Sequence, residues 1–139
     1  MRFQVVVGAI VMSLLTACAS EPPTRRELSA MSGLEMYESL CSSCHGVDGR
    51  GDGPVAPLVK IGVPDLTRIA QREGGEFPAA DVHRTIDGRF EHPAHGPRDM
   101  PVWGWQFYNS TTDNDARERA KVDAMIDRLV EYLRSIQKG

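Results

Sequence analysis

The chain has 139 residues, a length that fits one small domain. Its formal net charge is −3 and it contains no basic run, which argues against nucleic acid as a partner. Aromatic residues make up only 6% of the chain, which is little for a core built from side chains alone.

The first residues have the features of an export signal. Arg2 supplies a positive charge, and the apolar run over residues 5–15 is too short to span a bilayer. We therefore predict that residues 1–17 are a signal peptide.

Cys18 follows this apolar run in a lipoprotein-like context. Residues 15–18, Leu-Thr-Ala-Cys, resemble the lipobox of bacterial lipoproteins, in which the cysteine is acylated and becomes the first residue of the mature chain. We predict that acylated Cys18 anchors the protein to a membrane in the bacterial periplasm, with Ala19 favouring the outer membrane. The alternative is an ordinary signal peptide that happens to be cleaved beside a cysteine.

Residues 18–27 are predicted to be the lipidated N-terminus and a tether, because Pro22-Pro23 disfavours regular structure. The folded domain then covers residues 28–139. We find no internal repeat in it and a single cysteine motif.

An amphipathic helix over residues 31–40 is predicted to open the domain. Ser29 or Ser32 is expected to cap it, with Glu35 completing a capping box on Ser32. Its apolar positions recur every three residues, at Met31, Leu34, Tyr37 and Leu40.

This helix leads into Cys41-Ser42-Ser43-Cys44-His45, the Cys-x-x-Cys-His pattern of covalent haem attachment. Two thiols one helical turn apart can each add to a vinyl group of one porphyrin, and His45 then lies under the ring beside the iron. We therefore predict one haem c, bound covalently through Cys41 and Cys44 and ligated by His45. A buried porphyrin would also supply the apolar bulk that the aromatic residues do not.

Two other interpretations account for the cysteine pair. A thioredoxin-like redox pair follows a strand and starts a helix, whereas Cys41 follows a predicted helix. A zinc site would need His92 and His95 as further ligands, across a gap far longer than that of a zinc finger.

Shorter helices are predicted around residues 66–72, ended by Gly74-Gly75, and around residues 79–86, ended by Gly88. The rest of the middle of the chain is rich in glycine and proline. We find no convincing run of alternating residues that would predict strands, so the predicted fold class is all-α.

A last helix is predicted near the C-terminus. Its charges suit the helix dipole, with Asp113, Asp115 and Glu118 near the start and Arg134 and Lys138 near the end. Its apolar positions follow a three-four spacing, at Val122, Met125, Ile126, Leu129, Leu133 and Ile136.

Met100 is the predicted sixth ligand of the iron, because it lies in a loop and Pro101 stiffens its approach. Two other methionines leave with the signal peptide, and three lie in predicted helices, where methionine usually packs in the core. These five are Met1, Met12, Met31, Met36 and Met125.

Three histidines remain besides His45. His92 and His95 precede Met100 closely and compete with it as sixth ligand, which would lower the reduction potential. His83 falls in a predicted helix, where surface exposure or ordinary packing is expected.

In their order and spacing these segments resemble the class I cytochromes c, over nearly all of the mature domain. The resemblance rests on the attachment motif, the glycine-rich loop Gly49 to Pro54, the segment Pro64-Asp65-Leu66-Thr67 and the sixth-ligand segment Met100 to Gly104.

The resemblance implies a small fold in which the N- and C-terminal helices cross, with short helices and Gly/Pro-rich loops around one covalent haem. Gly33 and Tyr37 of the first helix and Tyr132 of the last match the crossing of that family.

The resemblance also implies contacts around the haem. The second ring N–H of His45 should bond to the carbonyl of Pro64, with Pro57 as the alternative, and Leu66 should pack against the porphyrin. Two arginines and two tryptophans are candidates for contact with the haem propionates. The alternative for the arginines is surface exposure, and for the tryptophans it is core packing. The four residues are Arg89, Arg98, Trp103 and Trp105.

An iron with two protein ligands has no open site, so we expect electron transfer, no catalytic residue and no enzymatic activity. The predicted function is a periplasmic, membrane-anchored one-electron carrier that cycles haem c between Fe(II) and Fe(III). Its expected partners are redox proteins, namely a dehydrogenase, a reductase or a terminal oxidase, which it meets as a monomer or as a subunit of a complex. The alternatives are a haem-based ligand-binding or catalytic subunit with a labile sixth site, and the electron-entry subunit of a larger oxidoreductase complex.

Overall fold

The computed structural model describes residues 22–60, 62–89, 100–108 and 115–139. Within these ranges the chain forms helices and no strand, which confirms the all-α fold class. The α-helices are α1 (Arg25–Ala30), α2 (Gly33–Leu40), α3 (Ser42–His45), α4 (Ile69–Arg72), α5 (Ala79–Asp87), α6 (Trp103–Phe107) and α7 (Ala116–Ser135), and the 3-10 helices are η1 (Ala56–Leu58) and η2 (Leu66–Arg68).

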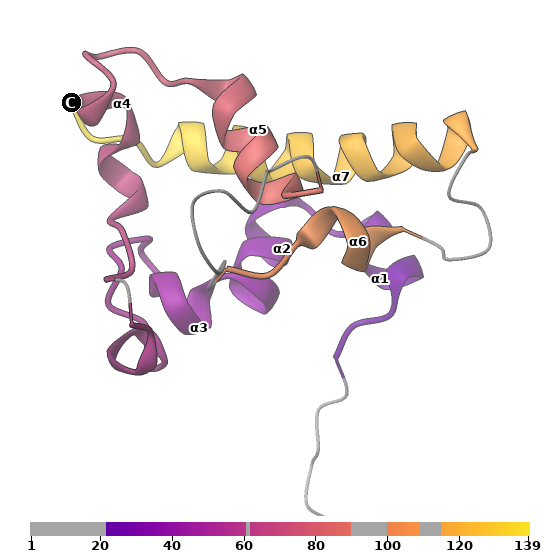
Figure 1. The fold of residues 1–139 in the computed structure, drawn as a ribbon, viewed down its shortest axis with the longest axis horizontal. Coiled ribbons are helices and arrows are strands. Elements are labelled where there is room, and N and C mark those ends of the chain that lie inside the picture. The colour runs from indigo at the N-terminus through magenta and orange to yellow at the C-terminus, as the bar shows by residue number, and fades with distance from the viewer. Residues whose placement is uncertain (1–21, 61, 90–99, 109–114) are drawn as a thin grey trace, which may run out of the picture.

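The long helix α7 lies across the other helices, and α2 crosses it (Figure 1). The two backbones approach closely at Gly33, where an added Cβ would overlap the carbonyl oxygen of Arg128. One turn further along, the rings of Tyr37 and Tyr132 pack with their centroids 5.0 Å apart. These are the residues that the resemblance to class I cytochromes c placed at the crossing.

Helix α2 confirms the predicted capping box, because Ser32 accepts from the backbone N–H of Glu35 and the Glu35 carboxylate accepts from the N–H of Ser32. Two details differ from the prediction. Met31 is the extended C-cap of α1, so α2 begins at Gly33. Leu34 is 46% exposed, because the helix turns Gly33 and Tyr37 toward α7.

Helix α1 has no counterpart in the sequence prediction, which assigned residues up to Glu27 to a tether. Thr24 and Glu27 form a capping box of their own, and the ion pair of Arg25 with Glu118 joins α1 to α7. The boundary of the folded domain at residue 28 stays a prediction, but in the described part of the chain the first helix already begins at Arg25.

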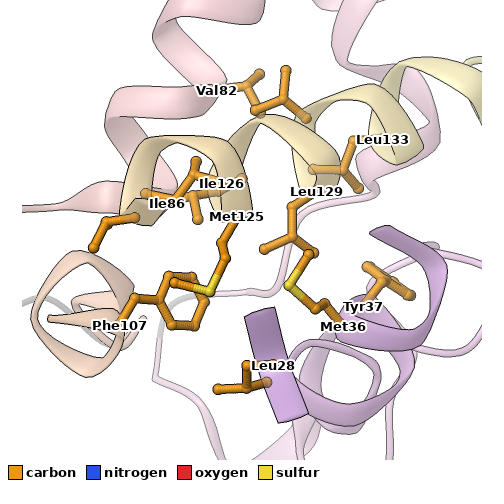
Figure 2. Packing of buried hydrophobic residues seen from close by; sticks show 12 residues of the cluster. Leu28, Met36, Tyr37, Val82, Ile86, Phe107, Met125, Ile126, Leu129 and Leu133 are labelled. Carbon is orange, nitrogen blue, oxygen red and sulfur yellow. The ribbon is translucent and has the colours of Figure 1, made fainter. Parts of the chain in front are cut away.

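Helix α7 supplies six of the twelve buried hydrophobic residues described, more than any other helix (Figure 2). Five of its six predicted apolar positions are buried, and the sixth, Ile136, is the partly buried C-cap. Met36 and Met125 are 0% and 1% exposed, so both pack in the core as predicted. The buried cluster comprises Leu28, Met36, Tyr37, Val82, Ile86, Phe107, Val122, Met125, Ile126, Leu129, Val130 and Leu133.

The two middle helices also form where they were predicted. The first is divided into η2 and α4, and positive φ angles of 78° and 105° at Gly74 and Gly75 follow it. Helix α5 ends at Gly88, whose φ of 66° is in the left-handed region that glycine adopts without strain.

Replacing Gly33 by alanine tests the helix crossing. The new methyl group would overlap the Arg128 carbonyl, so Gly33→Ala should lower the free energy of unfolding by about 1–3 kcal/mol, even though alanine favours helix. Urea unfolding of the haem-loaded protein measures this. Gly62→Ala is the matched control, because a Cβ there meets nothing within 4 Å. Equal stability of the two variants would contradict a close crossing at Gly33.

Candidate haem site

The cysteine motif occupies the turn that directly follows α2. The backbone N–H of His45 donates to the carbonyl of Cys41 over 2.9 Å, so Cys41 and Cys44 are separated by one helical turn. Both cysteines are partly buried and neither is in a disulfide. This is the spacing at which two thiols can bond to one flat ring.

Burial raises the pKa of the Cys41 thiol to about 12. A thioredoxin-like nucleophile requires the opposite, a pKa lowered toward neutrality by positive charge or a helix N-terminus. The structure therefore disfavours the redox-pair interpretation. His92 and His95, the further ligands of the zinc interpretation, lie outside the described residues.

His45 is oriented by the opposite segment of the chain. Its Nδ1 atom lies 3.4 Å from the carbonyl oxygen of Pro64, the contact that the resemblance implied. Burial lowers the pKa of His45, and the Pro64 carbonyl opposes that shift in part. A neutral ring held through Nδ1 leaves Nε2 to bind a metal, the usual arrangement of a ligating histidine.

The glycine-rich loop folds back onto the motif. The N–H groups of Gly51 and Gly53 donate to the carbonyls of His45 and Cys44 over 2.8 and 3.1 Å. An added Cβ at Gly51 would overlap the carbonyl oxygen of Val63, so the loop fits closely between the motif and the Pro64 segment.

Tyr37 joins the helix crossing to this loop. Its hydroxyl donates to the carbonyl oxygen of Gly46 over 2.6 Å, and its ring is fully buried. Burial also raises the pKa of the Tyr37 phenol, so the hydroxyl keeps its proton and remains a donor.

The segment that carries Pro64 and Leu66 is fixed at both ends. The Leu66 N–H donates to Gly49 over 2.7 Å, and the Gln137 amide donates to the Leu66 carbonyl and accepts from the Ala70 N–H, each over 2.9 Å. Leu66 is partly buried against the core. Sequence reasoning missed Gln137, since a polar residue just beyond a helix gives no pattern to recognise.

Met100 and Trp103 lie on another part of the chain. Met100 comes just before α6, and Trp103 is the first residue of that helix. Both are partly buried against the core, and the Trp103 ring stacks on that of Phe107 at 6.0 Å. Trp105, by contrast, is 57% exposed and packs near Tyr108. Arg98 lies outside the described residues.

Arg89 has protein partners that the sequence did not predict. Its guanidinium donates to both carboxylate oxygens of Asp87, the second over 3.0 Å, and lies 3.7 Å from Asp123. It also stacks over the Tyr108 ring, 4.4 Å from the centroid. Contact of Arg89 with a haem propionate stays a prediction.

The residues present suit a haem. Two free thiols stand one turn apart, a neutral imidazole adjoins them, and a thioether and the apolar side chains of Leu66 and Trp103 belong to the same core. Among the described residues no group of three or more His, Cys, Asp or Glu side chains forms a conventional metal cluster. Nitrogen and sulfur ligands of this kind are typical of haem iron.

The sequence profile of the Cytochrome c family matches residues 30–137. The chain belongs to the cytochrome c family. It is also 26% identical over 113 residues to the Cbb3-type cytochrome c oxidase subunit CcoP of Rhodobacter capsulatus, across 81% of this chain and 31% of that relative. The chain thus spans less than a third of that protein's length. No solved structure matches the chain significantly.

Family membership confirms the resemblance to class I cytochromes c and makes the chain a haem-binding, electron-transfer protein in general terms. No helix in the described ranges is long and apolar enough to cross a membrane. The signal peptide and the lipidation of Cys18 lie outside the described residues and stay predictions.

Removing the Tyr37 hydroxyl tests its role at the site. Tyr37→Phe leaves the buried Gly46 carbonyl without its donor, so the free energy of unfolding should fall by about 1–3 kcal/mol. Tyr132→Phe removes the hydroxyl of the other ring in the pair and should change it by less than about 0.5 kcal/mol. Chemical unfolding followed by haem absorbance and by circular dichroism measures both. Similar values for the two variants would show that the Tyr37 hydrogen bond contributes little.

Proposed function

We propose that this protein is a periplasmic, membrane-anchored one-electron carrier with one covalently attached, His/Met-ligated haem c. The observation that carries the proposal is the turn of free cysteines in which His45 points its Nδ1 at the Pro64 carbonyl. In a chain of the cytochrome c family, this turn has the geometry of an attachment site with an oriented axial ligand.

Each residue of the site has a distinct task in this proposal. Cys41 and Cys44 hold the haem by thioether bonds, so it stays bound through repeated redox cycles. His45 and Met100 would hold the iron as its two protein ligands and would leave no position for a substrate. Haem c supplies an iron that exchanges one electron between its ferrous and ferric states.

Pro64 and the surrounding loop keep this site rigid. The Pro64 carbonyl fixes the ring of His45, and the loop bonds from Gly51 and Gly53 hold the motif in place. A rigid ligand set changes little between oxidation states, which favours fast electron exchange.

Val47 and Leu58, which follow the motif closely in sequence, are 74% and 81% exposed. They offer apolar surface for the small, weak docking that is typical of redox partners.

The partner is a redox protein, and the similarity to an oxidase subunit favours one particular setting. The Rhodobacter capsulatus relative is named as a subunit of a cytochrome c oxidase. Delivery of electrons to a terminal oxidase, either as a free carrier or as a subunit of a complex, is therefore the preferred role. The acyl chains on Cys18 would raise the effective concentration near a membrane-bound partner.

Visible spectroscopy of the mature protein tests the proposal. We expect a sharp c-type α band on reduction, a methionine-to-iron charge-transfer band in the ferric form, and no change on adding carbon monoxide at neutral pH. A haem spectrum that shifts with carbon monoxide would instead assign a ligand-binding or catalytic role. A colourless protein from a host that matures c-type cytochromes would overturn the haem itself.

Met100→Ala tests the sixth ligand. Loss of the thioether should abolish the ferric charge-transfer band, open the reduced iron to stoichiometric carbon monoxide, and lower the reduction potential, because a thioether favours the reduced iron. Met36→Leu is the matched control, since Met36 is buried in the core away from solvent. An unaltered Met100→Ala spectrum would exclude Met100 as a ligand.

Cys18→Ala tests the anchor. Without an acylated cysteine the protein should move from the membrane fraction to the soluble periplasmic fraction or be retained as precursor, with its haem content judged separately by absorbance. Labelling with a radioactive fatty acid should fail in this variant. Unchanged membrane fractionation and labelling would contradict lipidation at Cys18.

A further inference from the structure

A buried ion pair lies where α5, α6 and α7 meet. The side chains of Asp87 and Arg89 are each only 6% exposed, and the guanidinium bonds to both oxygens of the carboxylate. Asp123 of α7 and the ring of Tyr108, the C-cap of α6, complete the group. We call these four residues the Arg89 cluster.

The Arg89 cluster attaches α6 to the end of α5. An added Cβ at Gly104 would overlap the carboxylate of Asp87 and the guanidinium of Arg89, so the first turn of α6 rests directly on the ion pair. A side chain at position 104 would have to displace the side chains of Asp87 and Arg89. Figure 1 shows α6 lying near the end of α5, which crosses α7.

Helix α6 depends on such contacts for its position. It spans only Trp103–Phe107 and has no side-chain cap at Val102, so local hydrogen bonding alone does not stabilise it. Phe107 anchors its C-terminal end in the core, where it is 0% exposed. Its N-terminal turn, the part next to Met100, rests on the Arg89 cluster through Gly104.

We propose that Asp87 and Arg89 are positioning residues that hold α6, and through it Met100, at the haem iron. The inference rests on the proposed function, in which Met100 is the sixth ligand. A thioether is a neutral, weak ligand, so its binding to the iron depends on the protein holding it in position. Met100 precedes α6 by only three residues, and a shift of the helix moves it directly.

This role differs from the contact with haem propionates expected from the sequence. Two donor nitrogens of Arg89 already bond to Asp87, and a second carboxylate, Asp123, lies 3.7 Å away. A buried carboxylate beside Arg89 compensates its charge within the protein. If Arg89 bound only the propionates, replacing Asp87 would not change the ligation of the iron by Met100.

Asp87→Asn in the haem-loaded protein tests the proposal. The amide cannot form the bidentate pair, so the ferric charge-transfer band should fall about twofold or more, and the reduced form should bind carbon monoxide, which the wild-type protein is expected not to do. The covalent haem-to-protein ratio should stay at the wild-type value. Asp81→Asn is the matched control, because the Asp81–Arg84 pair lies on the same helix but is exposed. It should behave as wild type.

Two further measurements keep each outcome decisive. Asp123→Asn removes the outer carboxylate, which is 51% exposed, and should change the band and carbon monoxide binding in the same direction but by less. This variant tests the proposal if Asp87→Asn yields no folded protein. A full band and no carbon monoxide binding in Asp87→Asn, or in Asp123→Asn where Asp87→Asn does not fold, would overturn the proposal. A wild-type protein that lacks the band would instead count against Met100 ligation, and hence against the proposed function itself.

Discussion

The close crossing of α2 and α7 is the constraint on which the site depends. Gly33 lets the two backbones approach, and the ring of Tyr37 fills the space beside it against Tyr132. The Tyr37 hydroxyl then bonds to Gly46, directly after the attachment motif. The position of the motif is thus set by the packing of two helices from opposite ends of the chain, and the same core continues to α6 and Met100.

Local signals allowed much of the fold to be predicted. The Ser32 capping box, the glycines after α4 and α5 and the three-four spacing of α7 each depend on residues a few positions apart. The attachment motif is equally local, because its chemistry requires five consecutive residues. The Pro64 contact with His45 was anticipated only through the resemblance to a family, since nothing in the spacing of those residues indicates it.

The rest depends on contacts between distant residues. Leu34 fits the apolar period of its helix but is exposed, because the face that packs on α7 contains Gly33. A glycine has no side chain and therefore does not register in an apolar period. The ion pair of Arg25 with Glu118 holds α1 in a stretch where two prolines predict a tether. The sequence offered Arg89 only as a candidate partner of the haem propionates, but its pairing with Asp87 and the close approach of Gly104 to both are visible only in three dimensions.

The pairing of α2 with α7 has a consequence for the order of events during synthesis. A contact between the two ends of a chain forms late, because closing so long a loop costs the most entropy. Until α7 emerges and docks, Tyr37 has no partner ring, and the turn that holds Cys41 and Cys44 is not enclosed. The thiols therefore remain accessible until α7 docks, and closure of the fold afterwards encloses whatever has been joined to them.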